Sequence, residues 1–137
     1  MRSVAVSRAM GHPHPRPEWF TGHVLLQEMN DADTSPALEI LAVFFERGAR
    51  TIPHVHSTDQ LLYFVEGVGV VGTIGRRVVY RPGGMAIVPA NEWHWHGATP
   101  GSPVCHLSIR PGGATVWAPD VPMHDWETYM AGATDDS

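Results

Sequence analysis

The chain has 137 residues, of which 43% are hydrophobic and 17% charged, and it contains 14 glycines and 12 prolines. This length suits one domain with a single hydrophobic core, and the composition is that of a turn-rich globular protein. Nine arginines and no lysine stand against 14 carboxylates, for a net charge of −5. No basic cluster is available for a nucleic-acid partner, and the lack of lysine excludes a Schiff base on a protein side chain.

The single cysteine, Cys105, excludes an intrachain disulfide and does not indicate an oxidising compartment. Near the N-terminus only Val4–Val6 is apolar, which is too short for a secretion signal. No run approaches the ~20 apolar residues of a membrane helix. We therefore expect a cytoplasmic protein with no membrane partner.

Residues 1–17 end in the sequence HPHPRP, which predicts a flexible, extended N-terminal arm. We do not expect His12 and His14 to hold a metal, because an arm offers no scaffold to fix coordination geometry. Residues 18–130 are predicted to form the folded domain, and residues 131–137 a frayed C-terminal tail.

Short apolar segments separated by turn residues make up the folded domain. Segments of about four to eight residues rich in Val, Ile, Leu, Phe and Tyr are typical of a sandwich or barrel, so the predicted fold class is all-β. Helical turns could form only around Thr34–Leu41 and Asp125–Met130. The expected strands are Val24–Gln27, Leu38–Phe45, Leu61–Glu66, Val68–Ile74, Arg77–Arg81, Met85–Val88 and Val104–Arg110.

Two histidine pairs have the spacing that brings both imidazoles to one face of a strand. His54 and His56 stand two residues apart in TIPHVHSTDQ, and His94 and His96 repeat this spacing in NEWHWHG. Gln60 begins the next strand, and its amide could face the same interior. Any one such histidine is more often a hydrogen-bonded structural residue, but two pairs in a β-rich chain favour a divalent transition-metal site.

At these residues the sequence resembles the cupins. Their first motif is a glycine, five residues, His-x-His, three or four residues, an acid, six residues and a glycine. Their second motif is a glycine, five residues, Pro-x-Gly, two residues and a histidine. The matching positions are Gly48, His54, His56, Gln60 and Gly67, and then Gly83, Pro89, Asn91 and His94.

The resemblance implies a single-domain cupin barrel, a double-stranded β-helix or jelly roll, over residues 18–130, with a bound metal. Two positions depart from the family pattern. Gln60 replaces the usual glutamate ligand, and Asn91 replaces a turn glycine, which a position with positive φ tolerates.

The combination of GARTxxHxH, a glutamine four residues later, HWHGA and CHLSI also looks like the small bacterial monocupins that include manganese-dependent hydroxynitrile lyases. This resemblance implies that the metal is held by His54, His56, Gln60 and His94, with His96 and His106 in the pocket as non-ligands. Manganese is then the expected ion, although imidazole and amide ligands also accept iron, cobalt, nickel or zinc.

The neutral side chain of Gln60 has a chemical consequence. Four neutral ligands leave a divalent ion its full charge, which favours anions and developing oxyanions. Alternatively, Gln60 hydrogen-bonds beside the site and water takes the fourth position.

Further polar residues are candidates for catalysis. His96 and His106 are the expected acid–base groups, because an imidazole titrates near ~pH 6.5. Thr51 could hydrogen-bond the substrate oxygen, although an ordinary β-branched strand residue is the preferred interpretation. Arg110 shares a face with His106 and could bind a carboxylate or phenolate, or it could be a solvated strand end.

The predicted function is that of a metal-dependent monocupin enzyme with lyase-type C–C bond chemistry on a small hydroxyl or carbonyl substrate. An iron-dependent dioxygenase, a polyketide cyclase or isomerase, and a non-catalytic ligand-binding cupin remain alternatives. Trp93 and Trp95 could stack such a ligand, but alternation with the histidines directs them to the opposite face. The apolar Val24–Gln27 strand and a sheet edge favour a homodimer or homotetramer.

Overall fold

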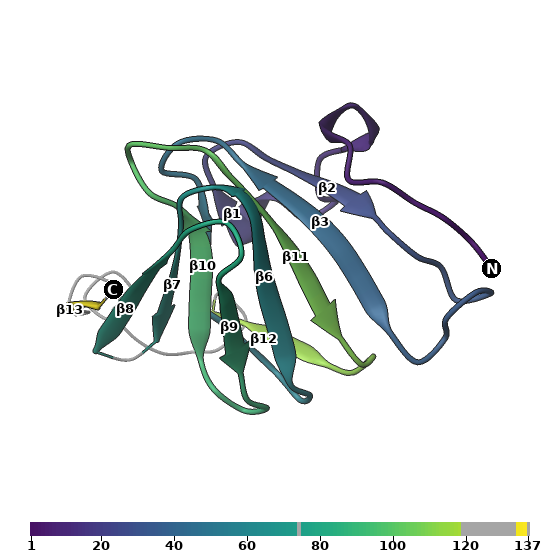
Figure 1. Cartoon of the computed structure of the whole chain (residues 1–137). Coiled ribbons are helices and arrows are strands. Elements are labelled where there is room, and N and C mark those ends of the chain that lie inside the picture. The colour runs from purple at the N-terminus through teal and green to yellow at the C-terminus, as the bar shows by residue number, and fades with distance from the viewer. Residues whose placement is uncertain (74, 119–133, 137) are drawn as a thin grey trace.

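The computed structural model of the chain describes residues 1–73, 75–118 and 134–136. These residues form strands and two short 3-10 turns, η1 (Arg8–Met10) and η2 (Pro17–Trp19), with no α-helix among them. The strands build two sheets that face each other as the layers of a sandwich (Figure 1). The predicted all-β fold class is therefore confirmed. Within the described ranges, no helix has the length and apolar character needed to cross a membrane.

Both sheets mix strands from distant parts of the chain. The five-stranded sheet has the order β2 (Val24–Glu28), β3 (Glu39–Phe45), β11 (Val104–Arg110), β6 (Gln60–Gly67) and β9 (Met85–Val88). The eight-stranded sheet has the order β1 (Phe20–Thr21), β4 (Arg50–Thr51), β10 (His94–Ala98), β7 (Gly69–Thr73), β8 (Arg76–Tyr80) and β13 (Thr134–Asp136), while β5 (His54–His56) pairs with β10 and with β12 (Thr115–Trp117). The seven strands expected from the apolar segments are all present, and their described ends agree to within one residue.

The expectation of a helical turn around Thr34–Leu41 is wrong, because this stretch forms hydrogen-bonded turns and the start of β3. A carboxylate oxygen of Asp31 accepts the backbone N–H groups of Asp33 and Thr34, at 3.0 and 2.9 Å, and this closes a turn between β2 and β3. Side chains that bond to the nearby backbone in this way compete with helix formation. The other helical candidate, Asp125–Met130, lies outside the described residues.

The interior changes from apolar to polar along the strands. On β11 the inward face runs from Val104 in the hydrophobic core through His106 and Ser108 to Arg110, and all four side chains are buried. On β6, which pairs antiparallel with β11, the inward face runs from Gln60 to Phe64. The core therefore fills one end of the space between the sheets and leaves polar side chains at the other. The largest buried core residues include Phe45, Leu62 and Phe64.

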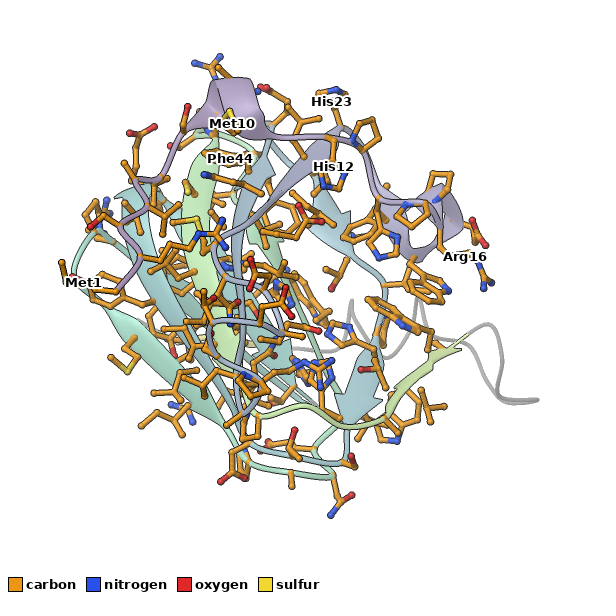
Figure 2. All side chains as sticks on the ribbon, turned by 90° about the vertical axis from the view of Figure 1, so that its right-hand side faces the viewer. Met1, Met10, His12, Arg16, His23 and Phe44 are labelled. Atoms are coloured by element: carbon orange, nitrogen blue, oxygen red, sulfur yellow. The ribbon has the colours of Figure 1, made fainter. Side chains whose placement is uncertain are left out.

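The N-terminal segment, residues 1–16, is extended apart from the 3-10 turn η1 and makes specific contacts with β2. The backbone of His12 exchanges two hydrogen bonds with Leu26, at 2.9 and 2.8 Å. The side chain of Gln27 accepts the N–H of Ser7 and donates to the carbonyl of Ala5. Figure 2 shows this segment passing from Met1 through Met10 and His12 to Arg16 across one side of the molecule. Its flexibility stays a prediction.

Candidate metal centre

Strands β5 and β10 bring three imidazoles together at the polar end of the interior. In β5, His54 and His56 point inward while Val55 between them does not, and the register places His94 of β10 directly opposite His54. The three side chains are buried, and one ring nitrogen from each lies within 4.8 Å of the others. This is the cluster that the two histidine pairs predicted.

Each of these imidazoles is oriented by a hydrogen bond at Nδ1. The partners are the carbonyl oxygen of Ile52 for His54 (2.9 Å), the carbonyl oxygen of Glu92 for His94 (2.9 Å) and the hydroxyl of Thr115 for His56 (2.8 Å). A carbonyl oxygen can only accept, so His54 and His94 carry their proton on Nδ1 and present a lone pair at Nε2. Metal-binding histidines are typically held by such a bond at the other ring nitrogen.

Burial keeps the cluster uncharged. Desolvation, followed by repulsion from neighbouring imidazoles, lowers the pKa of His54 well below its usual value and that of His56 to about 3. Burial also lowers the pKa of His94 to about 4. Neutral imidazoles are the form that binds metal. In addition, Nε2 of His56 is buried without a hydrogen-bond partner among the described residues, as expected for an atom that awaits a ligand.

Gln60 extends the cluster with an oxygen. Its amide Nε2 donates to the hydroxyl of Ser108 at 2.8 Å, and its Oε1 lies 2.9 Å from Nε2 of His94. Because neutral His94 carries its proton on Nδ1, two atoms with lone pairs face each other at this distance. Such a contact is unfavourable unless a cation binds to both atoms or the amide turns its NH₂ group towards His94. The donor set of three imidazoles and one amide oxygen therefore fits a divalent transition metal.

His96 lines the same cavity but is not part of the cluster of three. Its Nδ1 lies 2.9 Å from Nε2 of His106, and both rings are buried. His106 does not line the cavity; it lies behind His96, with its ring centre 5.4 Å from those of Phe45 and Phe64. Burial lowers the pKa of His96 well below its usual value and that of His106 to about 4, so both are neutral at pH 7.

The structure places the two remaining candidates, Thr51 and Arg110, in the wall of the same cavity. Thr51 is a buried strand residue whose hydroxyl accepts the backbone N–H of His96 at 3.2 Å, and it lines the cavity. Arg110 is 8% exposed, lines the cavity and donates from Nε to Glu39 at 3.2 Å. The interpretation of Arg110 as a solvated strand end is therefore wrong.

The cavity has a volume of about 480 Å³, and its aromatic wall was not predicted. Trp117 stacks on His54 with ring centres 4.3 Å apart, and Trp19 stacks on Trp117 at 4.4 Å. Trp117 and Thr115 belong to β12. This strand has three residues and is therefore shorter than the segments of four to eight residues from which strands were predicted. Trp95, by contrast, packs against Val70 and does not line this cavity, which confirms that it lies on the opposite face from the histidines.

Comparison with known proteins agrees with this geometry. Residues 42–110 match the family model described as a cupin domain. The chain belongs to the cupin family. In this cupin Asn91 has a φ of 69°, which is the left-handed conformation that the family's turn glycine adopts without strain.

Individual relatives cover most of the chain. This cupin is 35% identical over 94 residues to an (R)-mandelonitrile lyase of Granulicella tundricola, across 68% of this chain and 72% of the relative. A cupin-like protein of Thermotoga maritima has a crystal structure similar to this one, with a TM-score of 0.72, 27% identity, and 85% and 89% of the two chains covered. A polyketide cyclase of Streptomyces resistomycificus shares the fold, with a TM-score of 0.74, 18% identity, and 95% and 94% covered. The predicted jelly-roll cupin fold and the resemblance to lyase-type monocupins are confirmed.

Proposed function

We propose that this cupin is a metal-dependent lyase that breaks or forms a C–C bond in a small hydroxyl or carbonyl substrate. One observation carries the proposal: three neutral imidazoles and the Gln60 oxygen converge beside a cavity that also contains His96, an imidazole outside the cluster. A metal-assisted lyase that moves a proton uses such a separate acid–base group as well as a cation. The relative at 35% identity, named as an (R)-mandelonitrile lyase, supports this type of reaction.

The metal would be held by His54, His56, His94 and Gln60. Nitrogen and neutral oxygen donors suit manganese, the expected ion, and also iron, cobalt, nickel or zinc. When bound, the ion supplies a Lewis acid for negative charge that develops on the substrate oxygen. The four neutral donors do not reduce its double charge.

The protein's own acid–base group is His96. Its Nδ1 is engaged with His106, which leaves Nε2 for the cavity. In the cleavage direction, Nε2 takes the hydroxyl proton, the adjacent C–C bond breaks to leave a carbonyl compound, and the proton passes to the departing carbanion, such as cyanide. One hydroxynitrile thus gives one carbonyl compound and one molecule of hydrogen cyanide. Thr51 positions His96 through its backbone N–H.

Elemental analysis of the purified protein tests the first part of this proposal. We expect about one equivalent of metal per chain, and its loss in the His54→Ala, His56→Ala double variant. The second part is tested by measuring cyanide release from mandelonitrile by the manganese-loaded protein without oxygen. Protein that stays metal-free and refuses added manganese, iron and zinc would disprove the proposal. Oxygen consumption by the iron-loaded protein, with no anaerobic turnover, would favour a dioxygenase instead.

A further inference from the structure

Arg110 places a positive charge in the wall of the cavity. It ends β11 on the same inward face as His106 and Ser108, and only 8% of its surface is exposed. Its charge lies close enough to the histidine cluster to contribute to the lowered pKa of both His54 and His56. A group bound by Arg110 would therefore lie within the same cavity as the proposed reaction.

The guanidinium of Arg110 is incompletely paired. Its Nε donates to Glu39 at 3.2 Å, and the Glu39 side chain is 45% exposed. Its Nη1 is buried and has no hydrogen-bond partner in the part of the chain that the structure describes. A buried charged donor without an acceptor is costly, because it has lost water and gained no replacement. The cavity therefore offers a vacant donor for an acceptor that comes from a ligand.

A large part of the remaining cavity wall is aromatic and apolar, although Glu28, Asn30 and Glu39 also line the cavity. Trp19, Trp117 and His54 form a continuous stack, with ring planes tilted by 9° and 29° at the two contacts. The ring centres of Phe20 and Trp117 are 6.1 Å apart. The cavity is also lined by Ile40, Leu41 and Val43 of β3. Such walls favour a ligand with a flat or apolar body.

We infer that the substrate of this cupin is a small hydroxyl or carbonyl compound that also carries a carboxylate and an aromatic or apolar body, and that Nη1 of Arg110 binds this carboxylate. A carboxylate matches a guanidinium in both charge and geometry, whereas a neutral carbonyl or nitrile matches neither as well. For the reaction itself the inference rests on the proposed function. The contact between Arg110 and the carboxylate does not require the metal.

Mandelate and mandelamide test the inference, because they differ in charge but little in shape. Calorimetric titrations would measure the Kd of each, with the protein in its manganese-loaded and metal-free forms. We expect mandelate to bind more tightly than mandelamide. Arg110→Gln should weaken mandelate binding by about 10- to 100-fold and leave mandelamide binding nearly unchanged. The matched control Arg81→Gln, on the exposed turn after β8, should change neither Kd.

A second variant acts in the opposite direction. Glu39→Gln removes the carboxylate that competes for Arg110, so mandelate should bind more tightly to this variant. An unchanged preference for mandelate in Arg110→Gln, or the absence of mandelate binding to the parent protein at millimolar concentrations, would overturn the inference. Failure to bind manganese, iron and zinc would overturn the proposed function but would leave an Arg110-dependent preference measurable in the metal-free protein.

Discussion

Oε1 of Gln60 lies 2.9 Å from Nε2 of His94, and each atom turns a lone pair towards the other. The proton of His94 is held on Nδ1 by the carbonyl oxygen of Glu92, and the amide N–H of Gln60 is donated to Ser108. In this orientation of the amide neither side chain donates a proton into the contact, and either a cation bound to both atoms or a turn of the Gln60 amide that points its NH₂ group at His94 would relieve it. The site is arranged for a cation, and we expect metal binding to stabilise the folded protein by mass action.

Replacing Gln60 by glutamate should change the charge of the loaded site while preserving its shape. The variant Gln60→Glu halves the formal charge of a divalent ion with its ligands, so we expect metal binding to persist and azide affinity to fall by about tenfold. Azide titration of the cobalt-loaded protein, followed by its visible absorbance, measures this. Ser108→Ala is the control, because it removes the partner of the Gln60 amide without altering charge. Equal azide affinity in Gln60→Glu and the parent would argue against Gln60 as a ligand.

Thr115 should support metal binding although it is not a ligand. Thr115→Val removes the hydroxyl that holds Nδ1 of His56 at 2.8 Å and keeps the β-branched shape that suits β12. We expect metal affinity to fall by about 10- to 100-fold, measured by competition with a chromophoric chelator. Thr21→Val, at an exposed position of β1, is the matched control and should bind metal as the parent does. The same affinity in both variants would show that His56 needs no such support.

The pair of His96 and His106 should matter for turnover and not for metal content. We expect His96→Ala to retain its metal and to lose about 10²- to 10⁴-fold in kcat, because it removes the acid–base group that lines the cavity. His106→Ala should lose less, since His106 does not line the cavity and contacts His96 from behind. The exposed His23 provides the control variant His23→Ala. Full activity in both His96→Ala and His106→Ala would refute the acid–base assignment.

Much of the fold and the metal cluster could be predicted from the sequence, because both depend on local alternation. The period of two along a strand is enough to place His54 and His56 on one face, and it also sends Trp95 away from His94 and His96. The expected strands follow from the same regularity.

The remaining features of the site depend on which strands meet. His106 contacts His96 because β11 and β10 lie in opposing sheets, and no local pattern specifies that contact. Trp117 reaches His54 through the pairing of β12 with β5, which are far apart in the sequence. The turn at Asp31 was missed because its side chain, and not the apolar pattern, determines the backbone there. The homodimer or homotetramer stays a prediction.

Gly97 allows β10 to approach β4 closely, and this approach brings Thr51 within reach of His96. A Cβ at Gly97 would lie 2.3 Å from the carbonyl oxygen of Ala49 and 2.6 Å from the Cα of Arg50, both of which are backbone atoms. We expect Gly97→Ala to lower the free energy of unfolding by about 1–3 kcal/mol, measured by urea denaturation. Gly101→Ala is the control, since its Cβ would meet no atom within 4 Å. Equal stability of the two variants would show that the strands can separate at little cost.

The contact between His12 and Glu28 should make the N-terminal segment sensitive to pH. Nε2 of His12 lies 2.7 Å from a carboxylate oxygen of Glu28, and this hydrogen bond raises the pKa of His12 and lowers that of Glu28. Because its pKa is raised, protonated His12 stabilises the contact fully below the ordinary histidine pKa of about 6.5. This contribution is lost as pH rises through the raised pKa and His12 loses its proton. Because the pKa of Glu28 is lowered, its ionised carboxylate stabilises the same contact fully above about pH 4.5. This contribution is lost as pH falls through the lowered pKa and Glu28 gains a proton.

The contact should therefore hold the N-terminal segment on β2 most firmly between about pH 4.5 and 6.5. Its contribution to the stability of that attachment should be less than ~1 kcal/mol, because both side chains are about half exposed. Hydrogen exchange of the Leu26 amide, which donates to the His12 carbonyl at 2.8 Å, measures this once intrinsic exchange rates are corrected for. Its protection should decline above about pH 6.5 in the parent and stay level in His12→Gln. If protection in the parent is constant from pH 5 to 8, the ion pair does not hold the segment on β2.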